Sequence, residues 1–180
     1  MNEANIRREI YQMLRYRYGL WPDHWPDIAG KKRPGRPDLI IMNPRGPGFY
    51  IEVKHINLTR VRSFSFKSIG QSQRRWLSLW EEQRPNGSYL AIGVTGEMAR
   101  DVFIVPWLLW LKIEETVKSA QSSLPYLADS THRLVMRRNA YDFRMIDKWS
   151  CRRIAKKNRL PKESGWVLPP ELICRMELMP

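Results

Sequence analysis

The sequence contains few cysteine and histidine residues. Two of its 180 residues are cysteines and three are histidines. Cys151 and Cys174 lie far apart without a Cys-x-x-Cys pair, and the histidines are scattered along the chain. The sequence therefore has neither a zinc site of the usual local spacing nor the several cysteine pairs of small secreted domains. These counts exclude zinc fingers and disulfide-rich scaffolds.

A long hydrophobic run is also lacking. The most apolar stretch, VFIVPWLLWL at 102–111, has about half the length of a membrane helix and contains a proline. The N-terminal sequence MNEANIRREIYQML alternates charged with apolar residues and has no continuous apolar segment of the kind found in signal peptides. We therefore expect a cytoplasmic protein with no membrane segment.

Acidic residues are scarce relative to basic ones. The chain has 31 Lys and Arg residues against 18 Asp and Glu residues, which gives a formal net charge of +13. Such an excess favours a polyanionic partner, with nucleic acid as the first candidate. A hydrophobic fraction of 43% and eight tryptophans exclude a disordered basic tail, because such tails are poor in residues that can form a core. The composition indicates one folded domain that binds nucleic acid.

Hydrophobic periodicity predicts the element order α, β, β, α, β, β, α, and we expect an α/β domain with a central mixed sheet flanked by helices. The segment 21–37 is dense in proline, glycine and charge and is predicted to lack regular structure. The turn-forming sequence NPRGPG at 43–48 is predicted to join two strands as a hairpin. The predicted helices cover 3–18, 71–83 and 107–119, and the predicted strands cover 39–42, 49–53, 89–94 and 102–105.

The C-terminal part of the sequence is strongly basic. The segment 133–162 contains 11 basic and two acidic residues. We expect a core domain over 1–132 and a basic extension over 133–180 that packs on or beside it. A helix is predicted to carry Arg152, Arg153, Lys156, Lys157 and Arg159 and to end near Pro161. The last ten residues, ELICRMELMP, are apolar enough to dock on the core.

The segment GRPDLIIMNPRGPGFYIEVKH at 35–55 carries the most informative side chains. Residues alternate between the two faces of a strand, so Glu52 and Lys54 point to the same side. In a hairpin closed by the NPRGPG turn, paired residues have numbers that sum to about 91, and Asp38 then lies beside Val53. A register shift of one residue would reverse the faces. Three ionisable groups are predicted to converge among apolar neighbours.

These residue types suit hydrolysis of a phosphodiester bond. Two carboxylates on adjacent strands supply the hard oxygen ligands that Mg²⁺ prefers, with positions left for water and a phosphate oxygen. A lysine beside them could help the attacking water lose its proton, or it could stabilise negative charge on the phosphate oxygens. The sequence leaves both roles of Lys54 open.

The pattern Pro37-Asp38, thirteen intervening residues and Glu52-Val53-Lys54 resembles the signature of the PD-(D/E)XK nuclease superfamily. Within it, GRPDLII followed by FYIEVK resembles the VRR-NUC nucleases and the archaeal Holliday junction resolvases. The segment RSFSFKSIGQSQRRWLSLW at 62–80 resembles the RecU-type Holliday junction resolvases. The resemblance covers roughly residues 3–111. It implies a restriction-endonuclease-like core.

The resemblance also implies roles for individual residues. Asp38 and Glu52 match the carboxylates that bind Mg²⁺, for which Mn²⁺ substitutes, and the Val53 carbonyl matches the usual backbone ligand. Lys54 matches the catalytic lysine. Gln73 matches a glutamine that supports the site in resolvase-like members. The catalytic set implied by the resemblance is therefore Asp38, Glu52, Lys54 and Gln73.

Related nucleases often add an acidic residue from their first helix to the metal site. Glu3 has the better spacing relative to Ile6 and Ile10, and Glu9 is the alternative. The sequence also departs from the RecU type in two ways. RecU-type proteins do not usually have Pro-Asp at the position of Asp38, and they contain a large insertion between the early strands that is not evident here. The departures concern specificity for four-way junctions rather than the nuclease chemistry.

The implied function is a metal-dependent DNA endonuclease that acts on branched DNA in bacterial or phage recombination and repair. Symmetric cutting of a junction needs two active sites, so a homodimer is implied. The alternatives are a sequence-specific endonuclease of the restriction or homing kind and a DNA-binding protein without catalysis. The residues expected to contact DNA are Lys31, Lys32, Arg33, Arg36, Arg60, Arg62, Lys67, Arg74, Arg152, Arg153, Lys156 and Lys157.

Overall fold

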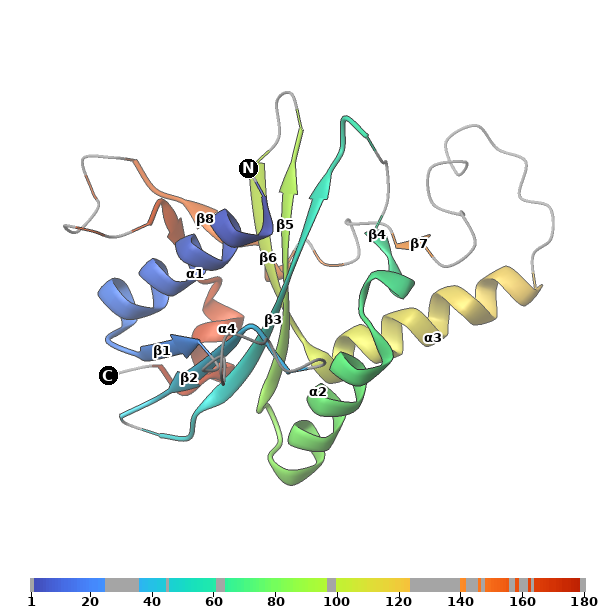
Figure 1. The fold of residues 1–180 in the computed structure, drawn as a ribbon, viewed down its shortest axis with the longest axis horizontal. Helices are drawn as coiled ribbons and strands as arrows, with labels where there is room; N and C mark the ends of the chain where they lie inside the picture. Colours follow the sequence, from blue (N-terminus) through green and yellow to red (C-terminus); the bar gives the residue numbers. More distant parts are fainter. Residues whose placement is uncertain are drawn as a thin grey trace, which may run out of the picture.

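The computed structural model describes residues 2–24, 36–44, 46–60, 64–96, 100–123, 140–141, 146, 148–155, 158, 162 and 164–178. Its helices are α1 (Glu3–Tyr18), α2 (Gln71–Gln83), α3 (Trp107–Ser123) and α4 (Pro170–Arg175), with a 3-10 turn at Phe66–Ser68. Its strands are β1 (Trp21–His24), β2 (Leu39–Met42), β3 (Phe49–Asn57), β4 (Phe64–Ser65), β5 (Ser88–Thr95), β6 (Arg100–Pro106), β7 (Ala140–Tyr141), β8 (Arg152–Arg153) and β9 (Trp166–Val167). Figure 1 shows their arrangement.

Five strands form a central mixed sheet in the order β1-β2-β3-β5-β6. The β3–β5 pair is parallel and is connected through α2, whereas the other neighbours are antiparallel. Two small sheets, β4-β7 and β8-β9, lie outside it. The predicted α/β class with a mixed sheet flanked by helices is confirmed.

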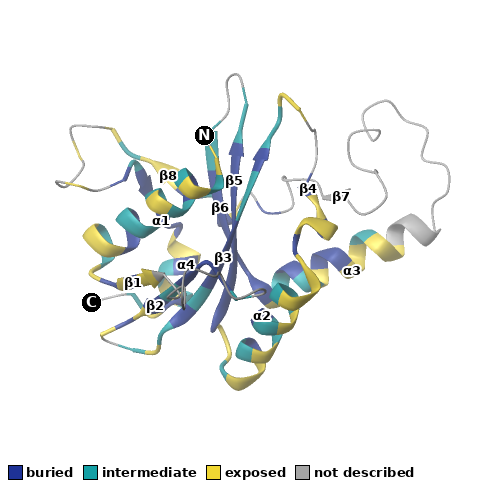
Figure 2. Cartoon of the chain, viewed as in Figure 1, coloured by how far each residue is buried: buried dark blue, intermediate teal, exposed yellow. Residues whose placement is uncertain are grey.

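The helices cover both faces of this sheet (Figure 1). Gly93 of β5 packs against Ile6 of α1. On the other face of the same strand, the Ser88 hydroxyl donates a 2.9 Å hydrogen bond to the Leu77 carbonyl of α2. Because successive residues of a strand alternate faces, these contacts place α1 and α2 on opposite sides. The central strands are buried between them, as Figure 2 shows.

Helix α1 forms over the predicted range. Asn2 caps its N-terminus through a 3.0 Å hydrogen bond from the Asn5 amide to the Asn2 side chain. Gly19 ends it in the left-handed region at φ 64°, where glycine has no steric penalty. Its apolar stripe is fully buried against the sheet and consists of Ile6, Ile10, Met13 and Leu14.

The hairpin between β2 and β3 is confirmed, but its register differs by one residue from the prediction. Leu39 pairs with Ile51 and Ile41 pairs with Phe49, so partner numbers sum to 90 rather than 91. Continued by one residue, this register sets Asp38 across from Glu52 and on the same face. The six-residue turn is compatible with either register, and burial of Leu39 and Ile41 selects the observed one.

The prediction that 21–37 lacks regular structure is wrong for its first residues. Trp21–His24 forms β1, which pairs antiparallel with β2. Pro22 is tolerated because β1 is the edge strand of the sheet, where one side of the backbone needs no partner. Residues 25–35 lie outside the described residues.

The C-terminal segment also differs from the prediction. Arg152 and Arg153 lie on strand β8, which pairs with β9, and not on a helix. Lys156, Lys157, Arg159 and Pro161 fall outside the described residues. The predicted docking of the last residues is confirmed, because Leu172 of α4 and Met176, which follows the helix, are buried in the same core cluster as the central strands.

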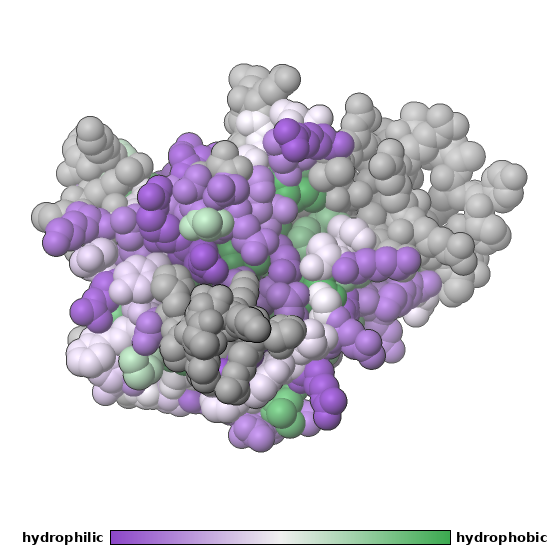
Figure 3. Space-filling model, viewed as in Figure 1, coloured by the Kyte–Doolittle hydropathy of each residue, from purple (hydrophilic) through white to green (hydrophobic). Residues whose placement is uncertain are grey.

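The described surface is mainly hydrophilic on the face shown in Figure 3. The largest fully buried side chains include Trp107, Trp110 and Tyr89. Burial in an apolar environment raises the pKa of the Tyr89 phenol far above its ordinary value. Among the helices that the structure describes, none has the length and hydrophobicity needed to cross a membrane.

Candidate active site

Strand β3 presents the central part of the site. Tyr50, Glu52 and Lys54 alternate with residues that face α1, so all three lie on the side that α2 covers. The β-branched residues between them, Ile51 and Val53, favour a strand at this position. The Glu52 side chain has no exposed surface, and that of Lys54 retains 13%. The sequence-based prediction of a shared face for Glu52 and Lys54 is confirmed.

Glu52 is held by two donors. The Lys54 ammonium lies 2.5 Å from Glu52 Oε1. Gln73, in the first turn of α2, donates from its amide nitrogen to the same oxygen. The Gln73 Oε1 atom accepts a 3.0 Å hydrogen bond from the Gly70 amide, and this bond turns the amide nitrogen toward Glu52. Gln73 thus links the start of α2 to the buried carboxylate.

Asp38 is tied to the backbone of β3. It precedes β2 and is 4% exposed. Its Oδ2 atom accepts a 3.0 Å hydrogen bond from the Val53 amide, between Glu52 and Lys54. Its Oδ1 atom lies 3.3 Å from Nη1 of Arg7 on α1. Asp38, Glu52, Lys54 and Gln73 are therefore brought together. The residue pattern predicted this for the first three, and the family resemblance implied it for Gln73.

The charges in the site are nearly balanced. Two buried carboxylates, those of Asp38 and Glu52, face two cations, Arg7 and Lys54. Burial of a charged group is costly unless it is paired and hydrogen bonded, so each contact offsets part of the desolvation cost. Arg7 was not predicted from the sequence, because it lies 31 residues before Asp38. Nothing in the local spacing relates the two residues.

The acidic residues of α1 lie in different places. One carboxylate oxygen of Glu9 binds the Arg100 guanidinium. The other accepts a 2.8 Å hydrogen bond from the Trp166 indole nitrogen. Both oxygens therefore serve the packing of β6 and β9 against α1. Glu3 is half-buried in the first turn of α1, four residues before Arg7 and on the same side of the helix. Helical spacing puts Glu3 on the side of α1 that carries Arg7, and its part in a metal site stays a prediction.

The donor set of the site suits a hard divalent cation. The Asp38 and Glu52 carboxylates and the Val53 carbonyl are oxygen donors, which Mg²⁺ prefers. Within the described ranges, no group of three His, Cys, Asp or Glu side chains forms a metal site. Mg²⁺ is commonly held by one or two carboxylates, with water and substrate phosphates as the other ligands, so the pair of carboxylates fits.

Arginine and aromatic side chains line the edge of the site. The Arg36 guanidinium lies 5.7 Å from the centroid of the Trp76 ring on α2. Tyr50 packs edge to face against Trp80, with ring centroids 4.5 Å apart. Burial raises the pKa of the Tyr50 phenol, and the positive charge of Arg36 opposes that rise. The hydroxyl group of Tyr50 therefore stays protonated at neutral pH.

The predicted DNA-contacting residues are only partly described. Arg60 and Lys67 are exposed beyond β3 and in the 3-10 turn. Arg152 and Arg153 are exposed on β8, where the Arg153 guanidinium lies 5.2 Å from the Trp166 ring. Six further residues, Lys31, Lys32, Arg33, Arg62, Lys156 and Lys157, lie outside the described residues.

Arg74 was expected to contact DNA, but its guanidinium is used inside the fold. Nη1 donates to Glu114 of α3 at 2.6 Å, Nη2 to the Phe66 carbonyl at 2.5 Å and Nε to the Ile69 carbonyl at 3.1 Å. A planar guanidinium with all three nitrogens engaged connects α2, α3 and the 3-10 turn. Arg74 therefore stabilises this part of the fold.

Replacement of Arg74 by lysine is expected to lower the free energy of unfolding by about 2 kcal/mol, because one ammonium cannot reproduce three forked hydrogen bonds. Urea unfolding measures the change. The neighbouring Arg75 is exposed, so Arg75→Lys is the matched control and should leave stability within about 0.5 kcal/mol of wild type. Equal stability of the two variants would contradict the assignment.

The site thus combines two buried carboxylates, a lysine, an arginine and a glutamine from α1, β2, β3 and α2. No protein-family model matches the chain, and neither a curated protein nor a solved structure is significantly similar to it. The function of this site has to be inferred from its own residues.

Proposed function

We propose that this protein is a metal-dependent endodeoxyribonuclease that hydrolyses phosphodiester bonds. The observation that carries the proposal is the pairing of two buried carboxylates, Asp38 and Glu52, with Lys54 Nζ 2.5 Å from one of them. Buried charged groups destabilise a fold relative to apolar residues of similar size, so such a cluster is a candidate functional site. Two carboxylates and a lysine on adjacent strands are the groups that this chemistry needs.

Asp38, Glu52 and the Val53 carbonyl would hold Mg²⁺, with Mn²⁺ as a substitute. Bound there, the ion would supply a Lewis acid that polarises the phosphate and makes the attacking water more acidic. Lys54 stabilises the negative charge that develops on the phosphate oxygens, because its ammonium contacts the Glu52 carboxylate. Gln73 keeps Glu52 oriented, and Arg7 does the same for Asp38. Neither Gln73 nor Arg7 transfers a proton in this role.

A restriction-endonuclease-like core is part of this proposal. Helix α1 precedes the β2–β3 hairpin, Asp38 stands immediately before β2, and the Glu-x-Lys pair lies in the middle of β3. The crossover through α2 then brings Gln73 to the same face. This order supports the proposal, because the resemblance to PD-(D/E)XK nucleases places Asp38, Glu52, Lys54 and Gln73 in the same succession.

DNA is the proposed substrate class because of the net charge of +13. The likeness of 62–80 to RecU-type resolvases favours branched DNA, processed in recombination or repair, and a homodimer with two active sites. Sequence-specific cleavage of the restriction or homing kind is the second candidate. Its cuts would fall at fixed positions in linear duplex.

Cleavage of matched labelled substrates tests the proposal. A four-way junction, a flap, a single strand and a linear duplex of related sequence are incubated with Mg²⁺ or with EDTA. We expect paired nicks in the junction with Mg²⁺, little cutting of the linear duplex and none with EDTA. Discrete cuts in linear duplex would instead support the second candidate. Salt-sensitive DNA binding without cleavage under any divalent ion would contradict the proposal and indicate a non-catalytic DNA-binding protein.

A further inference from the structure

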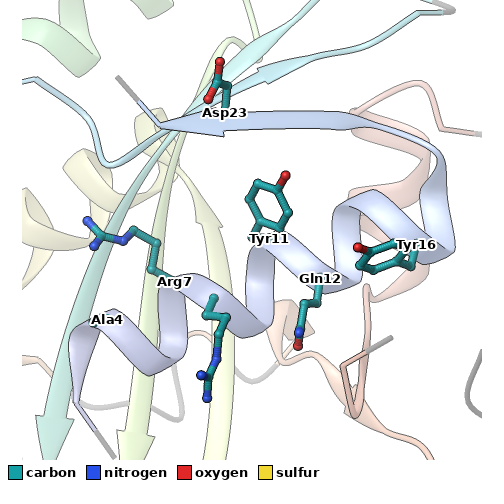
Figure 4. A pocket seen from close by; sticks show the side chains of 7 residues that line it. Ala4, Arg7, Tyr11, Gln12, Tyr16 and Asp23 are labelled. Atoms are coloured by element: carbon teal, nitrogen blue, oxygen red, sulfur yellow. The ribbon is translucent and has the colours of Figure 1, made fainter. Parts of the chain in front are cut away.

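A pocket of about 420 Å³ lies on the outward side of α1, next to β1 (Figure 4). We call it the α1 pocket. Helical spacing explains how it forms, because residues at i, i+3 and i+4 share a face, opposite the buried stripe of Ile6 and Ile10. Ala4 leaves space at one end. The other side chains that line the pocket are Arg7, Arg8, Tyr11, Gln12 and Tyr16 of α1 and Asp23 of β1.

Three of these side chains have unused binding capacity. Within the part of the chain that the structure describes, Arg8, Gln12 and Tyr16 form no hydrogen bond or ion pair. Arg8 is exposed, and 39% of the Tyr16 surface is accessible. Their positions, four residues apart in sequence, align them along one side of the helix. The pocket therefore offers a guanidinium, an amide and an aromatic ring in one row.

This combination suits a nucleotide. A guanidinium binds a phosphate oxygen, the amide both donates and accepts hydrogen bonds at a base edge, and a tyrosine ring stacks on a base. The volume falls within the range of about 300–1,000 Å³ that is usual for sites of small organic ligands. From Arg7 to Tyr16 the helix rises by about 13 Å, at 1.5 Å per residue. The pocket is thus long enough to separate a phosphate from a base.

Arg7 connects the α1 pocket to the candidate active site. Its side chain lines the pocket, keeps 33% of its surface exposed and lies 3.3 Å from the Asp38 carboxylate. A nucleotide bound in the pocket would therefore belong to a DNA strand that passes close to Asp38. We propose that the α1 pocket binds an unpaired nucleotide of the DNA substrate beside the bond to be cut. This inference rests on the proposed nuclease function.

Binding measured in EDTA tests the inference without cleavage. The two probes are a duplex with a single 2-aminopurine bulge and the same duplex with the 2-aminopurine paired. We expect wild type to bind the bulged DNA more tightly and to quench the fluorescence of its unpaired base. Tyr16→Ala should weaken binding of bulged DNA by about 5- to 100-fold, the range for the loss of one base stack, and should abolish the quenching. Arg8→Ala should weaken it by about 10- to 100-fold, the range for the loss of a hydrogen bond to a charged group.

Matched variants separate this inference from the proposed function. Tyr16→Phe keeps the ring and should retain both the preference and the quenching. Lys112→Ala removes one exposed positive charge from α3, as Arg8→Ala does from α1, and should leave the preference for bulged DNA unchanged. The inference would be overturned if wild type bound both probes with equal affinity, or if Tyr16→Ala and Arg8→Ala lowered the affinity for both probes equally. Either result would leave the proposed nuclease function standing. Binding of neither probe by wild type would overturn the proposed function along with the inference.

Discussion

Replacement of Glu52 by glutamine is expected to reduce metal-dependent cleavage by at least about 1,000-fold. The side chain has no exposed surface and is enclosed by its neighbours, so the isosteric amide fills the same volume. What changes is the charge: the variant lacks one of the two anionic ligands proposed for the metal, and Lys54 loses the carboxylate that it contacts at 2.5 Å. The measurement is kcat/KM with Mg²⁺ on the substrate that wild type cuts best.

The matched control is Glu82→Gln, which makes the same chemical change at an exposed position of α2. We expect full activity from this control. DNA affinity in EDTA should stay within about threefold of wild type for Glu52→Gln, because the residue acts on the hydrolytic step rather than on binding. Cleavage above a tenth of the wild-type rate in a folded Glu52→Gln variant would contradict the role assigned to this carboxylate.

The elements that could be predicted from the sequence are those marked by local chemistry. Helix α1 has a regular apolar stripe and ends at Gly19, and α2 ends before the turn at Asn86 and Gly87, so their bounds follow from the residues themselves. The hairpin register does not follow in this way. Its turn allows two pairings that differ by one residue, and only burial of one strand face against α1 decides between them.

The same distinction applies to the site. Glu52 and Lys54 are two residues apart on a strand, so their shared face could be predicted from spacing alone. Arg7 and Arg74 could not be assigned correctly, because their carboxylate partners, Asp38 and Glu114, lie 31 and 40 residues away and meet them only through tertiary packing. In a basic sequence, an arginine that stabilises the fold cannot be distinguished from one that contacts DNA until its neighbours are known.

Strand β1 and the basic C-terminal segment show how tertiary context overrides propensity. Pro22 disfavours a strand by itself, yet the free edge of the sheet accepts it. Arg152 and Arg153 have good helix propensity, but pairing with Trp166 and Val167 places them in β8. The Trp166 indole in turn binds Glu9, which connects this segment to α1.

Gly93→Ala is expected to lower the free energy of unfolding by about 1–3 kcal/mol, the usual cost of overpacking a core. A Cβ atom at this position of β5 would lie 1.8 Å from Cδ1, 2.6 Å from Cγ1 and 2.9 Å from Cγ2 of Ile6. The β-branched Ile6 side chain has little rotational freedom in a helix and cannot turn away, so α1 itself has to shift. Urea unfolding measures the loss, and Gly70→Ala is the control, because its Cβ would meet only Gln73 Oε1 at 3.5 Å.

A double-mutant cycle with Ile6 identifies the cause of this loss. Ile6→Ala alone should cost about 2–5 kcal/mol, because it leaves a cavity under α1. The combined variant should cost less than the sum of the two single changes, by about 0.5–3 kcal/mol, since each change relieves the strain or the cavity that the other creates. Additive losses would contradict a direct contact.

Arg7 follows Ile6 directly, so a shift of α1 that accommodates Gly93→Ala would also move the guanidinium that contacts Asp38. Cleavage activity should then fall with Gly93→Ala and recover partly in the double variant, even though neither residue lies in the site.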